Sequence, residues 1–358
     1  MERSSRASEL LAALTASTAS AIANAKRPRT VDASSQANPL PTLTDIRNDL
    51  AVHAGSLAKE VTALTLALKP PVTVDAVAAG LEKLSAIIAK LAYVVELLVG
   101  NGALAKRLSW YTLDLLEAFQ KFLPPATRAL EADAATSRDD VLRAAKTVWT
   151  VVDRSGTLPQ NELEAERQSW RDAISMLDDC LEELKDLEET VDADEPQEDA
   201  GRDEDVADPG AIPGRRGNEA SPAAAGPEAA AAPVSKERQR ISAARHLLRL
   251  GRLLIHRLVT KSASASTTFE DPSFLAAVRV PVSRLCALGD DIALELEPPQ
   301  DGLLDVVDEL CKVEDLLADE LERVVAGRST VDLQTSEAEW MQTWRKQRGG
   351  VRAKLDAI

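Results

Sequence analysis

Two double prolines, each preceded by a run of aliphatic residues, constrain most strongly how this chain can fold. The segment IALELEPPQD, from Ile292 to Asp301, has Glu295 and Glu297 just before its prolines, whereas LTLALKPPVTVD, from Leu64 to Asp75, has Lys69 at the position that matches Glu297. Because helical geometry is disfavoured for a residue that precedes proline, both segments are typical of a helix end. A catalytic or metal-binding carboxylate could not be exchanged for lysine, so the comparison favours helix termination over a carboxylate site.

The composition between such breaks predicts an all-α fold. Hydrophobic residues make up 45% of the chain and aromatic residues only 3%, so the core must consist mainly of Leu, Ala and Val. Leu and Ala are strong helix formers, whereas strands usually contain β-branched and aromatic residues. We therefore expect long helices, including one over about 43–68, a second that begins after Thr73 and ends at Gly100, and a third that ends or kinks at Pro124 and Pro125.

A further helix is expected to begin at a capping signal formed by Asn161 and Glu164. Within it, apolar residues alternate at spacings of four and three, which is typical of the coiled-coil-like seam of a helix that packs nearly parallel to a neighbour. The residues of this predicted seam are Trp170, Ile174, Leu177, Leu181 and Leu184.

The chain then changes in composition, which predicts its domain organisation. Residues 191–235 are acidic, rich in Pro and Ala, and almost without large apolar side chains, so they cannot bury enough surface to offset the entropy of ordering. We expect a disordered acidic linker there, between two multi-helix bundles of long antiparallel helices at 42–190 and 236–358. Residues 1–41 are expected to form an N-terminal helix and a flexible loop.

Charge and cysteine content narrow the classes of function. A formal net charge of −16 argues against direct DNA or RNA binding, because a phosphate backbone would repel the chain. The three cysteines, Cys180, Cys286 and Cys311, lack C-x-x-C spacing, which suits a reducing compartment. No apolar run reaches the length of a membrane span.

The sequence offers little support for catalysis. His53, His246 and His256 have no neighbours that would complete a metal or catalytic set, and no phosphate-binding, dinucleotide-binding, nucleophile-elbow or zinc-protease motif occurs. Cys180 lies among acidic residues that would raise its pKa and make it a poor nucleophile. We expect a non-enzymatic protein without catalytic residues, cofactor or metal.

Two groups of residues are candidates for partner binding. A basic stripe on a predicted helix could meet anionic lipid, a calmodulin-like protein or nucleic acid. It consists of Arg238, Arg245, Arg249, Arg252 and His256, of which Arg245, Arg249 and Arg252 are the candidate contacts. Packing of this stripe against acidic neighbours is the favoured interpretation. Near the C-terminus, Trp340 and Trp344, four residues apart and followed by Arg345, could anchor a partner, although a tryptophan pair that closes the core of a terminal helix is favoured.

Several segments together resemble the cyclin-D-binding (GCIP-like) family. They are EVTALTLALKPP, LAKRLSWYTLDLLEAF, VWTVVDRSGTLPQNELEAERQSWRDAISMLDDCLEEL and, after the acidic linker, GDDIALELEPP. The resemblance covers roughly Leu43 to Ile358, in the same order as in the family.

The resemblance implies two helical bundles akin to those of talin and vinculin, and a non-enzymatic interaction protein. Such proteins bind D-type cyclins and adaptor or helix-loop-helix proteins, restrain cell-cycle progression and transcription, and occur in cytoplasm and nucleus. The bundle architecture and the basic stripe leave open a second possibility, a cytoskeletal or membrane-associated scaffold.

Overall fold

The protein is all-α in a computed structural model, which describes residues 2–27, 41–98, 100, 102–131, 136–194, 235–264, 269–296, 302–326 and 331–358. No strand occurs within these ranges, and no helix among them is long and apolar enough to cross a membrane. The chain forms two compact units, Met1–Trp170 with Ala265–Ala276, and Arg171–Ser264 with Ala277–Ile358. The predicted all-α class is therefore confirmed.

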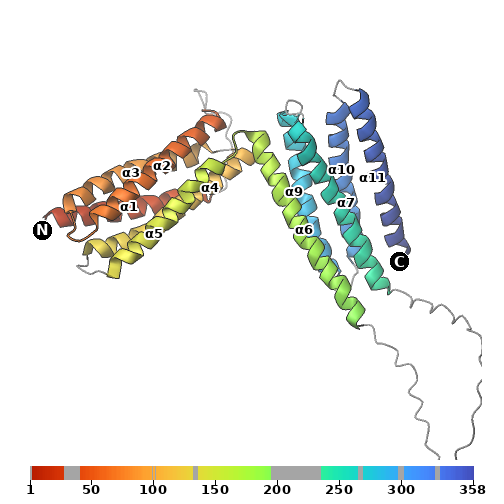
Figure 1. The fold of residues 1–358 in the computed structure, drawn as a ribbon, viewed down its shortest axis with the longest axis horizontal. Coiled ribbons are helices and arrows are strands. Elements are labelled where there is room, and N and C mark those ends of the chain that lie inside the picture. The colour runs from red at the N-terminus through yellow and green to blue at the C-terminus, as the bar shows by residue number, and fades with distance from the viewer. Residues whose placement is uncertain are drawn as a thin grey trace, which may run out of the picture. The chain divides into compact units, whose positions relative to one another are not determined.

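The first unit is a bundle of long helices (Figure 1). Its α1 packs against α3 and α4, its α2 against α3 and α5, and its α4 against α5. The elements are α1 (Glu2–Ala25), α2 (Leu43–Ala67), α3 (Val74–Leu97), α4 (Ala103–Glu131), α5 (Thr136–Asp153) and the 3₁₀ turn η1 (Arg154–Thr157).

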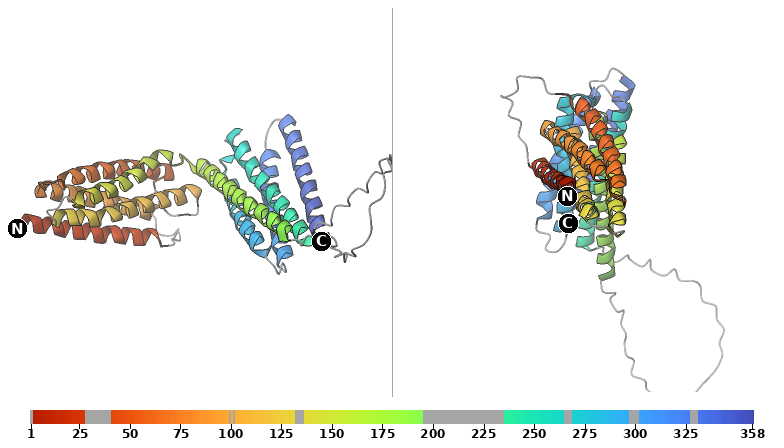
Figure 2. Two further views of the ribbon diagram at one scale, coloured as in Figure 1. Left: turned by 60° about the horizontal axis from the view of Figure 1, so that its bottom comes forward. Right: turned by 90° about the vertical axis from the view of Figure 1, so that its left-hand side faces the viewer.

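The second unit is also a bundle, as the left view in Figure 2 shows. In it, α7 packs against α10 and α11, and α10 packs against α11. Its elements are α7 (Lys236–Ser264), α10 (Leu303–Ala326), α11 (Val331–Ala357) and most of both α6 (Glu162–Asp194) and α9 (Pro272–Glu295). The predicted disordered linker falls almost wholly on residues outside the described ranges.

The unit boundaries differ from the predicted division in two respects. Helix α1 was expected to stand apart from the bundle, but Ala7, Leu11, Leu14 and Ala21 lie on one face of it and are buried in the core of the first unit. Helix α6 was assigned to the first bundle, whereas from Arg171 onward it is part of the second unit.

Local sequence signals explain several helix ends. Thr42 and Asp45 form a capping box at the start of α2, with the Asp45 backbone N–H donating to Thr42 Oγ1 at 3.1 Å. The helix ends at Ala67, just before the first double proline, as predicted. Helix α9 ends at Glu295, while Glu297 and its two prolines lie outside the described residues.

Of the end or kink predicted at Pro124 and Pro125, the end is wrong. Helix α4 continues through Pro124 and Pro125 as far as Glu131, so the prolines do not end it. The flanking residues Phe122, Leu123 and Ala126 are all buried, and this tertiary packing offsets the loss of helical hydrogen bonds that proline causes. Helix α3 begins directly after Thr73, as predicted, although the Thr73 side chain at the N-cap position makes no capping hydrogen bond.

Candidate interaction surfaces

Trp344 of α11 is a core residue. It is 2% exposed, and its indole Nε1 donates a hydrogen bond to the carbonyl oxygen of Leu250 of α7 at 2.9 Å. The guanidinium carbon of Arg348 lies 5.2 Å from the centre of its ring. Of the two interpretations of this tryptophan, core packing is the one that the structure shows.

Trp340, one turn earlier, lies at the edge of the same interface and is partly buried. The guanidinium carbon of Arg257 of α7 lies 5.0 Å from its ring centre, which is a cation–π contact. Arg257 also donates from Nε to Glu337 at 3.0 Å, and Lys261 forms an ion pair with the same carboxylate. Trp340 therefore covers a charged network within the second unit.

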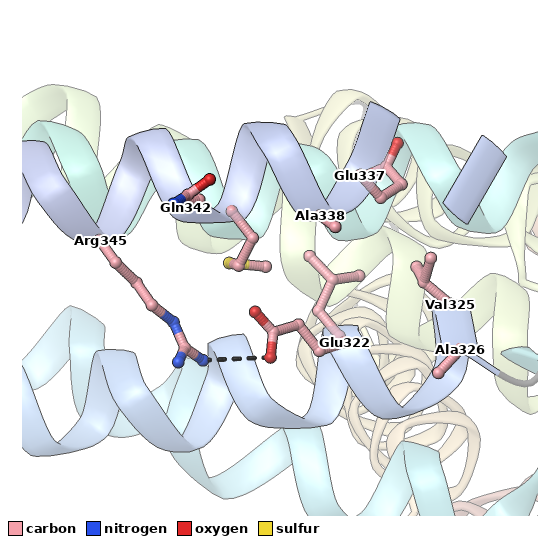
Figure 3. Close-up of a pocket in the computed structure, with 9 residues that line it drawn as sticks. Glu322, Val325, Ala326, Glu337, Ala338, Gln342 and Arg345 are labelled. Carbon is pink, nitrogen blue, oxygen red and sulfur yellow. Dashed lines mark ion pairs between the residues drawn. The ribbon is translucent and has the colours of Figure 1, made fainter. Parts of the chain in front are cut away.

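Arg345 is engaged across a groove between α10 and α11. It forms ion pairs with Asp319 at 2.8 Å and with Glu322 at 3.3 Å, and Figure 3 shows it reaching from α11 toward Glu322 on α10. The groove has a volume of about 530 Å³. Its lining residues are Leu321, Glu322, Val325, Ala326, Glu337, Ala338, Met341, Gln342 and Arg345.

The basic stripe of α7 faces acidic residues of α6. Arg245 pairs with Glu188 at 2.7 Å, and Arg252 donates to Asp178 through Nη2 at 3.0 Å. These contacts match the favoured interpretation, in which the stripe packs against acidic neighbours. Arg249, between them, is exposed. Of the three candidate arginines in the stripe, Arg249 is the best placed to meet a partner.

The buried seam of α6 differs from the predicted one. Trp170, Leu177 and Leu184 are buried as expected, but Ala173 and Cys180 complete the seam in place of Ile174 and Leu181, which are only partly buried. The reason is a close approach to α9, where a Cβ added to Gly289 would lie 3.4 Å from the sulfur of Cys180. The smaller side chains of α6 therefore face its neighbour.

The cysteines are protonated thiols at neutral pH. Burial raises the pKa of Cys180 to about 12, and a hydrogen bond that its Sγ donates to Asp290 at 3.3 Å adds to the effect. Burial likewise raises the pKa of Cys286 and of Cys311 to about 11. The predicted direction for Cys180 is confirmed, although burial, and not the acidic neighbours, is the largest cause.

Metal-ligand geometry is also absent from the part of the chain that the structure describes. No three His, Cys, Asp or Glu side chains within those ranges are grouped so that they could hold a metal ion. His53, on α2 in the first unit, has its pKa lowered by partial burial and by the nearby charge of Lys90.

An exposed tryptophan in the first unit was missed by the sequence reasoning. Trp110 of α4 is 59% exposed, and the guanidinium carbon of Arg107 lies 5.8 Å from its ring centre. Lys106 and Asp114, one turn before and one turn after it, are also exposed. The sequence feature that could have identified it is a large aromatic residue within the polar stripe of an amphipathic helix. Packing in the core does not explain a tryptophan at such a position. We call these four residues the Trp110 surface.

A comparison with family models finds a match over the segment that contains the Trp110 surface. The model described as Grap2 and cyclin-D-interacting, N-terminal, matches residues 49–190. A comparison with curated proteins gave no match. Because the family match ends within α6, the resemblance of residues 191–358 to the family stays a prediction. Residues 49–190 match the model of the N-terminal domain of the Grap2 and cyclin-D-interacting family, and over this segment the match confirms the resemblance to the cyclin-D-binding (GCIP-like) family that the sequence motifs predicted.

Proposed function

We propose that this chain is a non-enzymatic regulatory protein that binds a D-type cyclin or a cyclin-like protein through the helices of its first unit. The observation that carries the proposal is the family match over residues 49–190, whose description names cyclin D and Grap2 as what such proteins interact with. By the same resemblance, we propose that it restrains cell-cycle progression and acts in cytoplasm and nucleus.

The Trp110 surface is the proposed anchor for the partner. Trp and Arg are the residues most enriched at the energetic centres of protein interfaces, and here Trp110 and Arg107 lie together on α4. The ring is largely open to solvent, so burying it against a partner would remove apolar area from water at no cost to the core. Asp114, one turn on, is held by an ion pair with Arg154 at 2.8 Å, which supplies a fixed polar rim.

Most of the residues that the sequence suggested for partner binding are occupied within the second unit, which favours the Trp110 surface as the anchor. Trp344 is committed to the core, and Arg245, Arg252 and Arg345 are committed to ion pairs within the second unit. The scaffold alternative was suggested by the bundle architecture and by the basic stripe as a surface for anionic lipid. Within this stripe, Arg245 and Arg252 already have acidic partners. The protonated thiols support the non-enzymatic part of the proposal, since a thiolate is the nucleophilic form of cysteine.

Calorimetric titration of the purified full-length chain with a D-type cyclin tests the proposal. We expect Trp110→Ala to weaken binding at least tenfold, while the melting temperature stays within about 1 °C, because an exposed side chain contributes little to stability. Tyr93→Ala is the matched control, because Tyr93 is equally exposed at 59% but lies on α3. Normal binding by Trp110→Ala would exclude this anchor, and no binding by the unmodified chain would exclude the partner.

A further inference from the structure

A glutamate interrupts the buried seam of α10. The seam residues recur at alternating spacings of four and three, which is the pattern of a helix packed along its neighbours. All of them are aliphatic except Glu314, which is fully buried at 0% exposure. The full seam is Leu303, Val307, Leu310, Glu314, Leu317, Leu321 and Val324.

The carboxyl group of Glu314 has no hydrogen-bond partner within the described part of the chain, at either oxygen. Helix α7 closes over it at Gly251, where an added Cβ would lie only 2.8 Å from Glu314 Oε1. The same added atom would lie 3.0 Å from Leu285 of α9. The carboxyl group therefore faces a backbone position without a side chain, and an aliphatic side chain lies against that same position.

The charged and titratable groups nearest to Glu314 do not neutralise it. Helix α10 itself presents Cys311 and Asp315, and α11 presents Arg348. Arg348 forms an ion pair with Asp315 at 2.7 Å, and it donates to the carbonyl oxygen of Cys311 at 2.9 Å. Its guanidinium also lies over the ring of Trp344. Among the described residues, Arg348 is the cation that acts on Glu314, and its guanidinium is engaged by these other groups.

These surroundings favour the uncharged form of the side chain. Burying an ionised carboxylate without a partner is far more unfavourable than burying a neutral carboxyl group. Burial raises the pKa of Glu314 well above its usual value; the charge of Arg348 opposes this shift, and Asp315 adds to it.

We propose that Glu314 holds a proton while the second unit is folded and releases it to solvent when this unit opens, so that the unit is a proton-linked conformational switch. The device is independent of the proposed cyclin binding, because it lies in the core of the second unit and uses none of the residues of the Trp110 surface.

The direction of the pH dependence follows from proton linkage. The folded unit binds one proton more than the opened unit at any pH between the two pKa values of Glu314. The contribution of Glu314 to the stability of the unit is therefore fully present below the unfolded pKa, about 4.3 for a free glutamate, and is lost as the pH rises through the folded pKa. Within this window, the equilibrium constant for opening increases up to tenfold per pH unit.

Hydrogen–deuterium exchange on the full-length chain tests the proposal. Exchange of α10 peptides is measured between pH 5.5 and 7.5 and corrected for the intrinsic effect of pH on amide exchange. We expect protection of α10 in the unmodified chain to fall by three- to tenfold per pH unit, and protection in Glu314→Gln to be independent of pH. Glu320→Gln is the matched control, because Glu320 lies on the same helix with its side chain partly exposed, and it should keep the slope of the unmodified chain.

Glu314→Met serves if the glutamine variant does not fold, since Met has a similar length and no charge; it should also remove the slope. Infrared absorption gives a direct second measurement: the unmodified chain at pH 6.5 should show a protonated-carboxyl band that Glu314→Gln lacks. A flat pH profile for the unmodified chain, or the absence of this band, would overturn the proposal. Protection that rises with pH would overturn it as well, because it would mean that Glu314 is ionised and paired with Arg348.

Discussion

A hydrogen bond between Trp344 and Leu250 connects α11 with α7 in the second unit. The indole Nε1–H of Trp344 donates to the carbonyl oxygen of Leu250 at 2.9 Å, and both residues are buried. A carbonyl oxygen within a helix can accept a second hydrogen bond, so α7 provides this acceptor without losing its own helical geometry. The contact fixes the position of α11 on α7 through a polar group within an apolar interface.

Trp344→Ala is therefore expected to destabilise the second unit by about 3–5 kcal/mol, the usual range for removing a buried tryptophan. Trp344→Phe should lose less, about 1–3 kcal/mol, because it keeps most of the ring contacts but removes the hydrogen bond. Trp340→Ala is the control, since Trp340 is only partly buried. Calorimetric melting of the full-length chain measures the three variants, and equal effects at 340 and 344 would contradict the assignment.

Glu337 should make the second unit sensitive to acid. Burial alone would raise its pKa, but hydrogen bonds from Arg257 and Lys261 outweigh burial and lower the pKa. A group with a lowered folded pKa contributes stability above its unfolded pKa and loses that contribution as the pH falls through the folded value. We expect Glu337→Gln to destabilise the unit by about 1–3 kcal/mol at pH 7.

The difference between Glu337→Gln and the unmodified chain should begin to shrink as the pH falls below the unfolded value, about 4.3 for a free glutamate. It should disappear once the pH lies below the lowered folded pKa of Glu337. Urea denaturation at a series of pH values measures this convergence. Glu339→Gln, on the exposed side of the same helix, is the control and should change stability by less than about 0.5 kcal/mol. A constant difference at all pH values would show that the carboxylate charge is not what stabilises the contact.

Two glycines in helices of the second unit should respond oppositely to alanine. At Gly251 an added Cβ would lie 2.8 Å from Glu314 and 3.0 Å from Leu285, whereas at Gly350 of α11 nothing lies within 4 Å. We expect Gly251→Ala to destabilise by about 1–3 kcal/mol through overpacking. Gly350→Ala should stabilise by about 0.5–1 kcal/mol through higher helix propensity. Melting temperatures that move in the same direction would contradict the predicted contact at Gly251.

The presence of the helices and several of their ends depend on local sequence, and these features could be predicted from it. The end of α2 before Pro70 depends only on the geometry of neighbouring residues. The capping signal at Asn161 is confirmed too, because Asn161 Oδ1 accepts from the Glu164 backbone N–H at 2.9 Å. By contrast, α4 passes through Pro124 and Pro125 because packing outweighs the local preference.

The face of a helix that becomes buried is harder to predict from sequence. On α6 the larger residues Ile174 and Leu181 suggested the seam, but the adjacent Ala173 and Cys180 are buried instead. The choice depends on Gly289, which is more than a hundred residues away in sequence and admits a close approach of α9. The burial of Glu314 is equally hard to predict from its own helix, because Gly251 on another helix makes room for its carboxyl group.

The N-terminus of α4 is capped by a side chain from another helix. Glu162, the first residue of α6, accepts hydrogen bonds from the backbone N–H groups of Ala103 at 2.6 Å and Leu104 at 3.1 Å. The first N–H groups of a helix have no partner within it, and a negative charge there is favourable. Gly102 leaves room for the carboxylate, since an added Cβ would lie 2.8 Å from it. Glu162 thus caps α4 from a distant part of the chain.

Glu162→Ala should destabilise the first unit by about 1–2 kcal/mol, the usual effect of losing a helix cap. Glu162→Gln should lose less, because the amide oxygen can still accept one of the two hydrogen bonds while the charge is lost. The matched control is Glu164→Ala, since Glu164 accepts from the backbone N–H of Gln160, next to its own helix. Exchange of the Ala103 and Leu104 amides should accelerate only in the Glu162 variants. Unchanged exchange at these two amides would show that the cap does not form in solution.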